Sequence, residues 1–275
     1  MRIVDRGSGT PLVVIPGIQG RWEYLRPAVE ALSMRHRILT CSLPDERPFS
    51  GEYDNRLDGF ADTIERMLDD RGIRRAVICG VSFGGRIALR FAASRPTRTA
   101  GLVLVSTPGP RWHLRESHRR FAQSPWLSAP AFFVGASDRM RREIRLALPR
   151  TRDRVRFLMR MAALALTAPA SPARMAARAL LIDGVSSTED CARVTCPTLV
   201  LNGEPALDHV VPVDGSSEYV SLIADASSAT LHGTGHQGPL LRPAEFARIV
   251  GEFASSLSIH DDSAQAPSSK AHDAA

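Results

Sequence analysis

Residues 76–94 read AVICGVSFGGRIALRFAAS, and they carry the strongest structural signal in the chain. The first four form an apolar run without alternation, which is typical of a strand buried on both faces. The residues from Ser82 to Ser94 have the apolar spacing of an amphipathic helix. Between them, GVSFGG (80–85) contains the pattern G-x-S-x-G, in which a serine occupies a sharp turn from strand to helix. Such a turn holds the serine hydroxyl above the sheet at the positive end of the helix, so the stretch predicts a nucleophile at Ser82.

The same alternation of strand and helix extends through the first hundred residues. Strands are expected at residues 12–15, 37–42, 76–79 and 101–105, and helices at 22–34, around 60–68 and at 82–94. Parallel strands joined by helices need right-handed crossovers, which place helices on both faces of the sheet. The predicted fold class is therefore α/β, with a mostly parallel sheet.

The alternation stops between residues 110 and 194, where only helices are predicted. They are expected at 138–148, 152–166 and 172–182, after which strands resume at 198–202 and 229–232 and a last helix covers 244–257. Residues 1–109 and 195–257 are therefore interpreted as one core, interrupted by a helical cap at 110–194 and followed by a disordered tail at 258–275. In the helix at 152–166 the apolar residues share one face, so burial is predicted for Val155, Leu158, Met159 and Ala162.

The composition is that of an ordinary globular protein. Hydrophobic residues make up 44% and charged residues 23% of the 275, which excludes a disordered or fibrous chain. The net charge is +6, and Lys270 is the only lysine among 35 basic residues, which indicates coding bias more than a polyanionic partner. The first apolar run, 12–15, is too short for a secretory signal, and a membrane span of about 20 apolar residues is not found. We therefore expect a cytoplasmic protein with four reduced cysteines.

A serine hydroxyl needs a positioned base to take its proton, and eight histidines compete for this role. His236 is preferred because GTGHQG (233–238) forms a glycine-lined loop between the last predicted strand and the last helix. This loop leaves the sheet at its carboxyl edge, the same edge as Ser82. His232 is placed within the strand, and the other histidines have no comparable setting.

The base in turn needs a carboxylate that fixes its tautomer and steadies its charged form. Asp208 is preferred, because the loop that follows the strand at 198–202 leaves the carboxyl edge and can reach the histidine on the next loop. Glu204 and Asp214 are the alternatives, each of which is more simply explained as a solvated loop charge.

Negative charge that develops on a substrate oxygen needs backbone N–H donors. The N–H of Phe83, directly after the serine, is one candidate. The segment IPGIQG (15–20) follows the first buried strand and is rich in glycine, so the Ile18 N–H is expected to be the second. The alternative interpretation of this segment is a plain turn.

Five motifs together make the chain similar to the α/β-hydrolase superfamily. They are PGIQG (16–20), GVSFGG (80–85), CPTLVLNGE (196–204), LDHVVP (207–212) and GTGH (233–236). The resemblance covers residues 3–257, and the chain order serine, aspartate, histidine agrees with it. It implies that the helical insertion covers the site and sets substrate choice. Two departures are visible: Pro16 replaces the usual histidine before Gly17, and the loop from Gly203 to Asp208 is longer than usual.

The residues and the resemblance jointly predict a serine hydrolase that cleaves small or medium-sized carboxylic esters through an acyl-enzyme. No metal and no organic cofactor is implied. Cleavage of carbon–carbon bonds and perhydrolysis use the same three residues, so both stay open. A ligand-binding protein that has kept these residues is the alternative from a different class.

The expected partner is a small-molecule ester or acyl substrate. The arginines from Arg139 to Arg160 could dock an acidic acyl-carrier protein, although a solvated helix face is the simpler interpretation. No nucleic-acid-binding motif accompanies these arginines, and neither nucleic acid nor membrane is expected as a partner.

Overall fold

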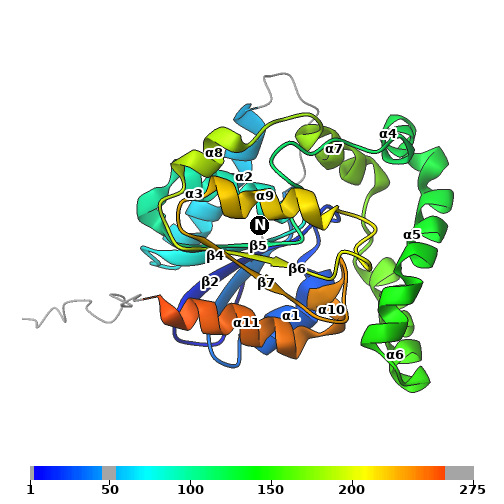
Figure 1. Cartoon of the computed structure of the whole chain (residues 1–275). Coiled ribbons are helices and arrows are strands. Elements are labelled where there is room, and N and C mark those ends of the chain that lie inside the picture. Colours follow the sequence, from blue (N-terminus) through cyan, green and yellow to red (C-terminus); the bar gives the residue numbers. More distant parts are fainter. Residues whose placement is uncertain (1–2, 45–53, 258–275) are drawn as a thin grey trace, which may run out of the picture.

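The computed structural model describes residues 3–44 and 54–257, which are built around a seven-stranded sheet (Figure 1). In spatial order the strands are β1 (Ile3–Arg6), β3 (Arg37–Cys41), β2 (Pro11–Ile15), β4 (Ala76–Val81), β5 (Thr99–Val105), β6 (Thr198–Asn202) and β7 (Ala226–Thr230). β1 pairs antiparallel with β3, and the other pairs are parallel. The predicted α/β class with a mostly parallel sheet is confirmed. The tail predicted at 258–275 lies outside the described residues.

Several elements differ from the sequence prediction, among them both outer strands and the first helix. β7 starts at Ala226 and ends at Thr230, so His232 lies beyond the strand. β7 lies at the edge of the sheet, contains two serines and is partly exposed. It therefore lacks the apolar run that marks a buried strand. β1 was not predicted for the same reason, since its four residues are all at least partly exposed. The helix expected at 22–34 is a 3₁₀ helix, η1 (Trp22–Leu25), followed by α1 (Arg26–Leu32), because Pro27 fits only the first turn of a helix.

Helices cover both faces of the sheet (Figure 1). On one face lie α1 and α11 (Pro243–Ser256), whose apolar residues pack with those of β2 and β4. On the other face lie α2 (Asp54–Asp69), α3 (Phe83–Ser94), α8 (Thr188–Arg193) and α9 (Val213–Leu222).

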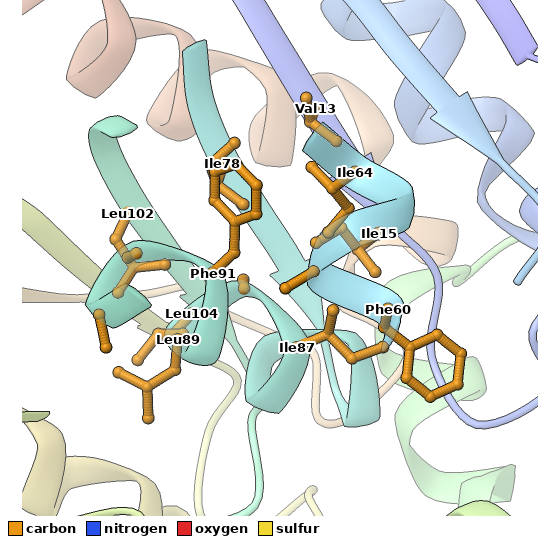
Figure 2. Close-up of a cluster of buried hydrophobic side chains, with 14 of the residues drawn as sticks. Val13, Ile15, Phe60, Ile64, Ile78, Ile87, Leu89, Phe91, Leu102 and Leu104 are labelled. Atoms are coloured by element: carbon orange, nitrogen blue, oxygen red, sulfur yellow. The ribbon is translucent and has the colours of Figure 1, made fainter. Parts of the chain in front are cut away.

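The core around α3 fixes the position of the serine turn. Figure 2 shows Ile87 and Phe91 of α3 among the side chains of neighbouring strands and of α2. The rings of Phe60 and Phe83 meet edge to face at 5.9 Å between centroids. Burial of each such side chain contributes about 1.5–3 kcal/mol, so α3 and the residue before it have little freedom to move.

Between β5 and β6 the described residues form helices and their connections, without a strand. The helices are α4 (Glu116–Gln123), α5 (Pro125–Ala147), α6 (Thr151–Thr167), α7 (Pro172–Ile182) and α8. α5 begins at Pro125, well before the predicted residue 138, and proline suits the first helical position. α5 and α6 stand beside the sheet (Figure 1), and none of the helices in the described ranges is both long and apolar enough to cross a membrane. The division into core and cap at residues 109 and 195 stays a prediction.

The predicted burial of one face of α6 is wrong. The exposed fractions are 49% for Val155, 55% for Leu158 and 68% for Met159, and Ala162 is exposed as well. α6 has a second apolar stripe, formed by Phe157, Met161 and Leu164, and this stripe faces the protein. Phe157 and Met161 line a cavity of about 300 Å³ together with residues of α10 (Gly238–Leu241). Two apolar stripes compete on this helix, and periodicity alone cannot decide between them.

All four cysteines are buried, and none forms a disulfide. Burial raises the pKa of Cys41 and Cys196 to about 11 and that of Cys79 and Cys191 to about 12. The thiols are therefore protonated at neutral pH, as the sequence led us to expect for reduced, packed side chains.

Candidate active site

Ser82 occupies a turn between β4 and α3 with φ 55° and ψ −121°. This left-handed conformation is strained for a residue other than glycine, and the surroundings hold it in place. The Ser82 N–H donates to the carbonyl of Val105 at 2.8 Å. A Cβ at Gly80 would lie 2.2 Å from the Gly84 carbonyl oxygen, so the strand and the helix can approach this closely only with glycine there.

The structure brings His236 to the Ser82 hydroxyl. The His236 Nε2 atom lies 3.1 Å from Ser82 Oγ, within hydrogen-bond distance. On the other side of the ring, Nδ1 lies 3.3 Å from Asp208 Oδ2. His236 is 154 positions from Ser82 and 28 positions from Asp208 in the sequence. In the structure the three side chains form one hydrogen-bonded chain.

Asp208 is held by its own loop. Its Oδ1 atom accepts the N–H groups of Val210 at 3.0 Å and Val211 at 2.9 Å, which leaves Oδ2 for the imidazole. The alternatives from the sequence lie elsewhere. Glu204 accepts the Gly233 N–H at 2.8 Å at the base of the histidine loop, and Asp214 is exposed in the first turn of α9.

The charges around the imidazole set its basicity. Burial by itself would lower the pKa of His236, but the carboxylates of Asp208 and Glu143 outweigh it, and the pKa is raised above its ordinary 6.5. Burial likewise works to raise the pKa of Asp208, yet His236 and the two backbone N–H donors bring it below its ordinary 3.8. At neutral pH an ionised Asp208 therefore faces an imidazole of strengthened basicity.

The segment after β2 lies against the serine turn. A Cβ at Gly17 would be 3.4 Å from both Ser82 Cβ and the Val81 carbonyl oxygen, so the two backbones are in contact. The Gly20 N–H donates to the Gly17 carbonyl at 2.8 Å, closing a turn in which Ile18 is a central residue. Phe83 is the first residue of α3, where backbone N–H groups have no carbonyl partner within the helix. The Gly17 backbone and the first residue of α3 therefore both lie next to Ser82, and the assignment of the Ile18 and Phe83 N–H groups as donors stays a prediction.

Two buried charged residues of the helical insertion reach these loops. Glu143 of α5 is 1% exposed and accepts N–H groups from the histidine loop. Arg178 of α7 is 2% exposed and donates from Nη1 to the Ile18 carbonyl at 3.0 Å. Neither residue carries a sequence signal for a site, because both lie in arginine-rich helices whose charges ordinarily face solvent.

Within residues 3–44 and 54–257, no group of three or more histidine, cysteine, aspartate or glutamate side chains is arranged to hold a metal ion. The arrangement has the groups that nucleophilic chemistry at a carbonyl carbon needs: a hydroxyl, a base and backbone N–H donors.

Comparison with known proteins agrees with the geometry. The model of the alpha/beta hydrolase family matches residues 12–249, a range that includes Ser82, Asp208 and His236. The chain belongs to the alpha/beta hydrolase family. The resemblance inferred from the five motifs is thereby confirmed, and this alpha/beta hydrolase shares its fold with many solved structures.

Relatives of this alpha/beta hydrolase carry different activities in their names. The 2-hydroxymuconate semialdehyde hydrolase of Pseudomonas sp. (strain CF600) is 30% identical over 266 residues, which cover 90% of this chain and 88% of that protein. A thermophilic esterase from Thermogutta terrifontis has a TM-score of 0.73 at 22% identity and covers 93% of both chains. A meta-cleavage product hydrolase from Pseudomonas fluorescens IP01 has a TM-score of 0.69 at 24% identity, covering 92% of this chain and 93% of that one. The two structural matches show the fold.

Proposed function

We propose that this alpha/beta hydrolase cleaves carboxylic esters of small molecules through a covalent acyl-enzyme. The observation that carries the proposal is the hydrogen-bonded chain from Ser82 through His236 to Asp208, with distances of 3.1 and 3.3 Å. A hydroxyl at a strained turn, next to an imidazole of raised pKa, is an activated nucleophile.

In the proposed reaction, Ser82 Oγ attacks the acyl carbon while its proton passes to His236 Nε2. The charge on the substrate oxygen is taken up by the N–H groups of Ile18 and Phe83, and Asp208 stabilises the imidazolium. The bond to the leaving alcohol then breaks, and His236 gives this alcohol the proton. Water, activated by the same imidazole, finally attacks the acyl-enzyme and releases the acid.

Carbon–carbon bond hydrolysis is the second candidate. It is favoured by the relative named as a 2-hydroxymuconate semialdehyde hydrolase, whose similarity extends over 90% of this chain. In such a substrate the bond that breaks joins two carbons, so a carbanion equivalent must be protonated where an ester would release an alkoxide. The same serine, base and N–H donors serve both reactions.

The test combines two classes of substrate with a probe of the nucleophile. Wild type and Ser82→Ala are assayed on p-nitrophenyl esters of increasing acyl length and on 2-hydroxymuconate semialdehyde, and both are treated with a fluorophosphonate. We expect labelling of wild type alone, at Ser82, and ester hydrolysis well above the rate of Ser82→Ala.

Each outcome separates the candidates. Turnover of the semialdehyde with negligible ester hydrolysis would replace the ester proposal with carbon–carbon cleavage. A wild type that neither labels nor turns over any of these substrates would contradict a serine hydrolase and favour a ligand-binding protein.

A further inference from the structure

The carboxylate of Glu143 bridges the backbone on both sides of His236. Its Oε1 atom accepts the N–H of Gly235 at 2.8 Å and the N–H of Gln237 at 2.8 Å. Glu143 belongs to α5, in the helical insertion, and lies 92 positions before Gly235 in the sequence. One oxygen atom of the insertion therefore contacts the loop at the two amides that flank the imidazole.

The same loop also lies against the segment that carries Asp208. A Cβ at Gly235 would lie 2.3 Å from the Leu207 carbonyl oxygen and 2.8 Å from the Asp208 backbone nitrogen. The histidine loop is thus in contact with both Glu143 and the aspartate loop. One carboxylate orients the imidazole through its Nδ1 atom, and the second holds the backbone from which the imidazole projects.

Burying a carboxylate costs free energy unless hydrogen bonds or opposite charges compensate for the lost water. Glu143 is 1% exposed, and burial raises its pKa to about 7 against the effect of the two N–H donors. Of the charged groups near Glu143, His236 favours the ionised carboxylate and lowers its pKa, whereas Asp208 disfavours the ionised form and raises the pKa. An apolar side chain would fill the space but would leave two buried N–H groups without an acceptor.

We infer that Glu143 is a positioning residue for His236, so that the reactivity of Ser82 depends on the docking of α5 against the histidine loop. This inference rests on the proposed function of His236 as the base. When α5 is docked, both flanking amides are held and Nε2 stays 3.1 Å from the hydroxyl. When the acceptor is lost, the loop is free to turn and the base moves away from the proton that it must take.

The experiment compares Glu143→Ala with Glu143→Gln, which keeps an acceptor oxygen at the same reach. Glu116→Gln is the matched control, because its carboxylate lies on α4 with 72% of the side chain exposed. Each variant is assayed for kcat and KM on the best ester and for the rate of fluorophosphonate labelling. We expect Glu143→Ala to lose about 10- to 100-fold in kcat and in labelling rate, because small displacements of a base have effects of this size.

The pattern across variants separates positioning from simple stability. KM of Glu143→Ala should stay within about threefold of wild type, and Glu143→Gln should recover kcat to within about threefold, since it restores the acceptor. If Glu143→Ala does not fold, Glu143→Asp takes its place, because its shorter side chain withdraws the oxygen from the amides and should lower kcat in the same way.

A folded Glu143→Ala or Glu143→Asp that labels and turns over like wild type would overturn the inference while leaving the proposed function intact. Equal loss in Glu143→Gln and Glu143→Ala would also overturn it, since the acceptor alone would then not suffice. A wild type that fails to label at Ser82 would overturn the inference together with the proposed function.

Discussion

His236 is the residue on which both hydrogen bonds of the candidate site converge, and Asp208 is the partner that fixes its orientation. Replacing Asp208 by Asn keeps the shape but removes the charge and favours the wrong tautomer. We expect kcat to fall by a factor on the order of 10³–10⁴, measured on the best ester substrate. Asp214→Asn, which changes an exposed carboxylate on α9, should leave kcat unchanged. A loss below about tenfold for Asp208→Asn would contradict its assigned role.

The raised pKa of His236 predicts the pH dependence of the reaction. Only the neutral imidazole can accept the serine proton, so kcat/KM should fall as the pH is lowered through a midpoint above 6.5. Glu143→Gln removes one of the two negative charges that raise this pKa, and its midpoint should move to lower pH. A pH series of kcat/KM on one ester measures both midpoints, and an unshifted midpoint in Glu143→Gln would contradict the electrostatic assignment. Glu116→Gln should reproduce the wild-type midpoint.

For single residues, the sequence identifies a candidate site residue when its neighbours in the sequence form a recognisable pattern. Ser82 and His236 could be selected because glycines and a strand-to-helix or strand-to-loop transition surround them. Glu143 could not, because its two hydrogen-bond partners are backbone groups of a distant loop, and backbone groups leave no trace in residue identity.

Among the elements, α7 supports the segment that carries Ile18. Its Arg178 donates to the Ile18 carbonyl, and a Cβ at Gly20 would collide with the guanidinium, so the side chain is packed directly on this turn. Arg178→Leu should let the Ile18 N–H drift from its place and lower kcat by about 10- to 100-fold, less than the roughly 10²–10³-fold lost when one N–H donor is removed outright. Arg174→Leu, on an exposed position of the same helix, is the control. Unchanged kcat in Arg178→Leu would show that the turn keeps its shape without the Arg178 guanidinium.

The buried Glu143 makes the docking of α5 sensitive to pH. Its pKa is about 7 in the folded protein against an ordinary 4.5, so the folded state binds more protons between these values. The stabilising effect is complete below pH 4.5 and is lost as the pH rises to about 7. The wild-type free energy of unfolding should therefore decrease by about 3 kcal/mol over this window relative to Glu143→Gln, in urea titrations at several pH values. Parallel pH profiles for the two proteins would contradict a buried, titrating carboxylate.

The spacing of apolar residues predicts whether a segment is a helix or a strand more readily than it predicts which face of that element is buried. The bounds of α7 and β6 agree with the prediction because each has one apolar pattern and clear ends. α6 has two apolar stripes, and the stripe that faces the protein lines a cavity with residues of α10, about 80 positions away. Such a choice depends on tertiary contacts that no local window contains.

For the molecule as a whole, Arg86 links α3 to the segment before the helical insertion and to the connection between α7 and α8. Its guanidinium donates to the Gly109 carbonyl at 3.1 Å and to the Val185 carbonyl at 2.8 Å, and the residue is 1% exposed. Arg86→Met would leave both carbonyls without this donor, and we expect a loss of about 2–4 kcal/mol in unfolding free energy, seen as a lower urea midpoint. Arg111→Met, whose side chain is 63% exposed, should change stability by less than about 1 kcal/mol. Equal midpoints for the two variants would contradict this role.

The order of the elements and the parallel sheet could be predicted because alternation of strand and helix permits few topologies. The contacts between the helical insertion and the site loops could not. They depend on two buried charged side chains, Glu143 and Arg178, that reach backbone amides or a carbonyl far along the chain.

The four packed sulfhydryls give the protein a built-in reporter of opening. With each of them enclosed and protonated, an alkylating reagent such as iodoacetamide has no reactive sulfur to attack while the native state persists. Modification must then wait for the chain to open, and its rate follows the population of open forms. A single cysteine introduced on the outer surface of α4 would accept a dye selectively, so the surroundings of α4 could be followed by fluorescence without first removing any native cysteine.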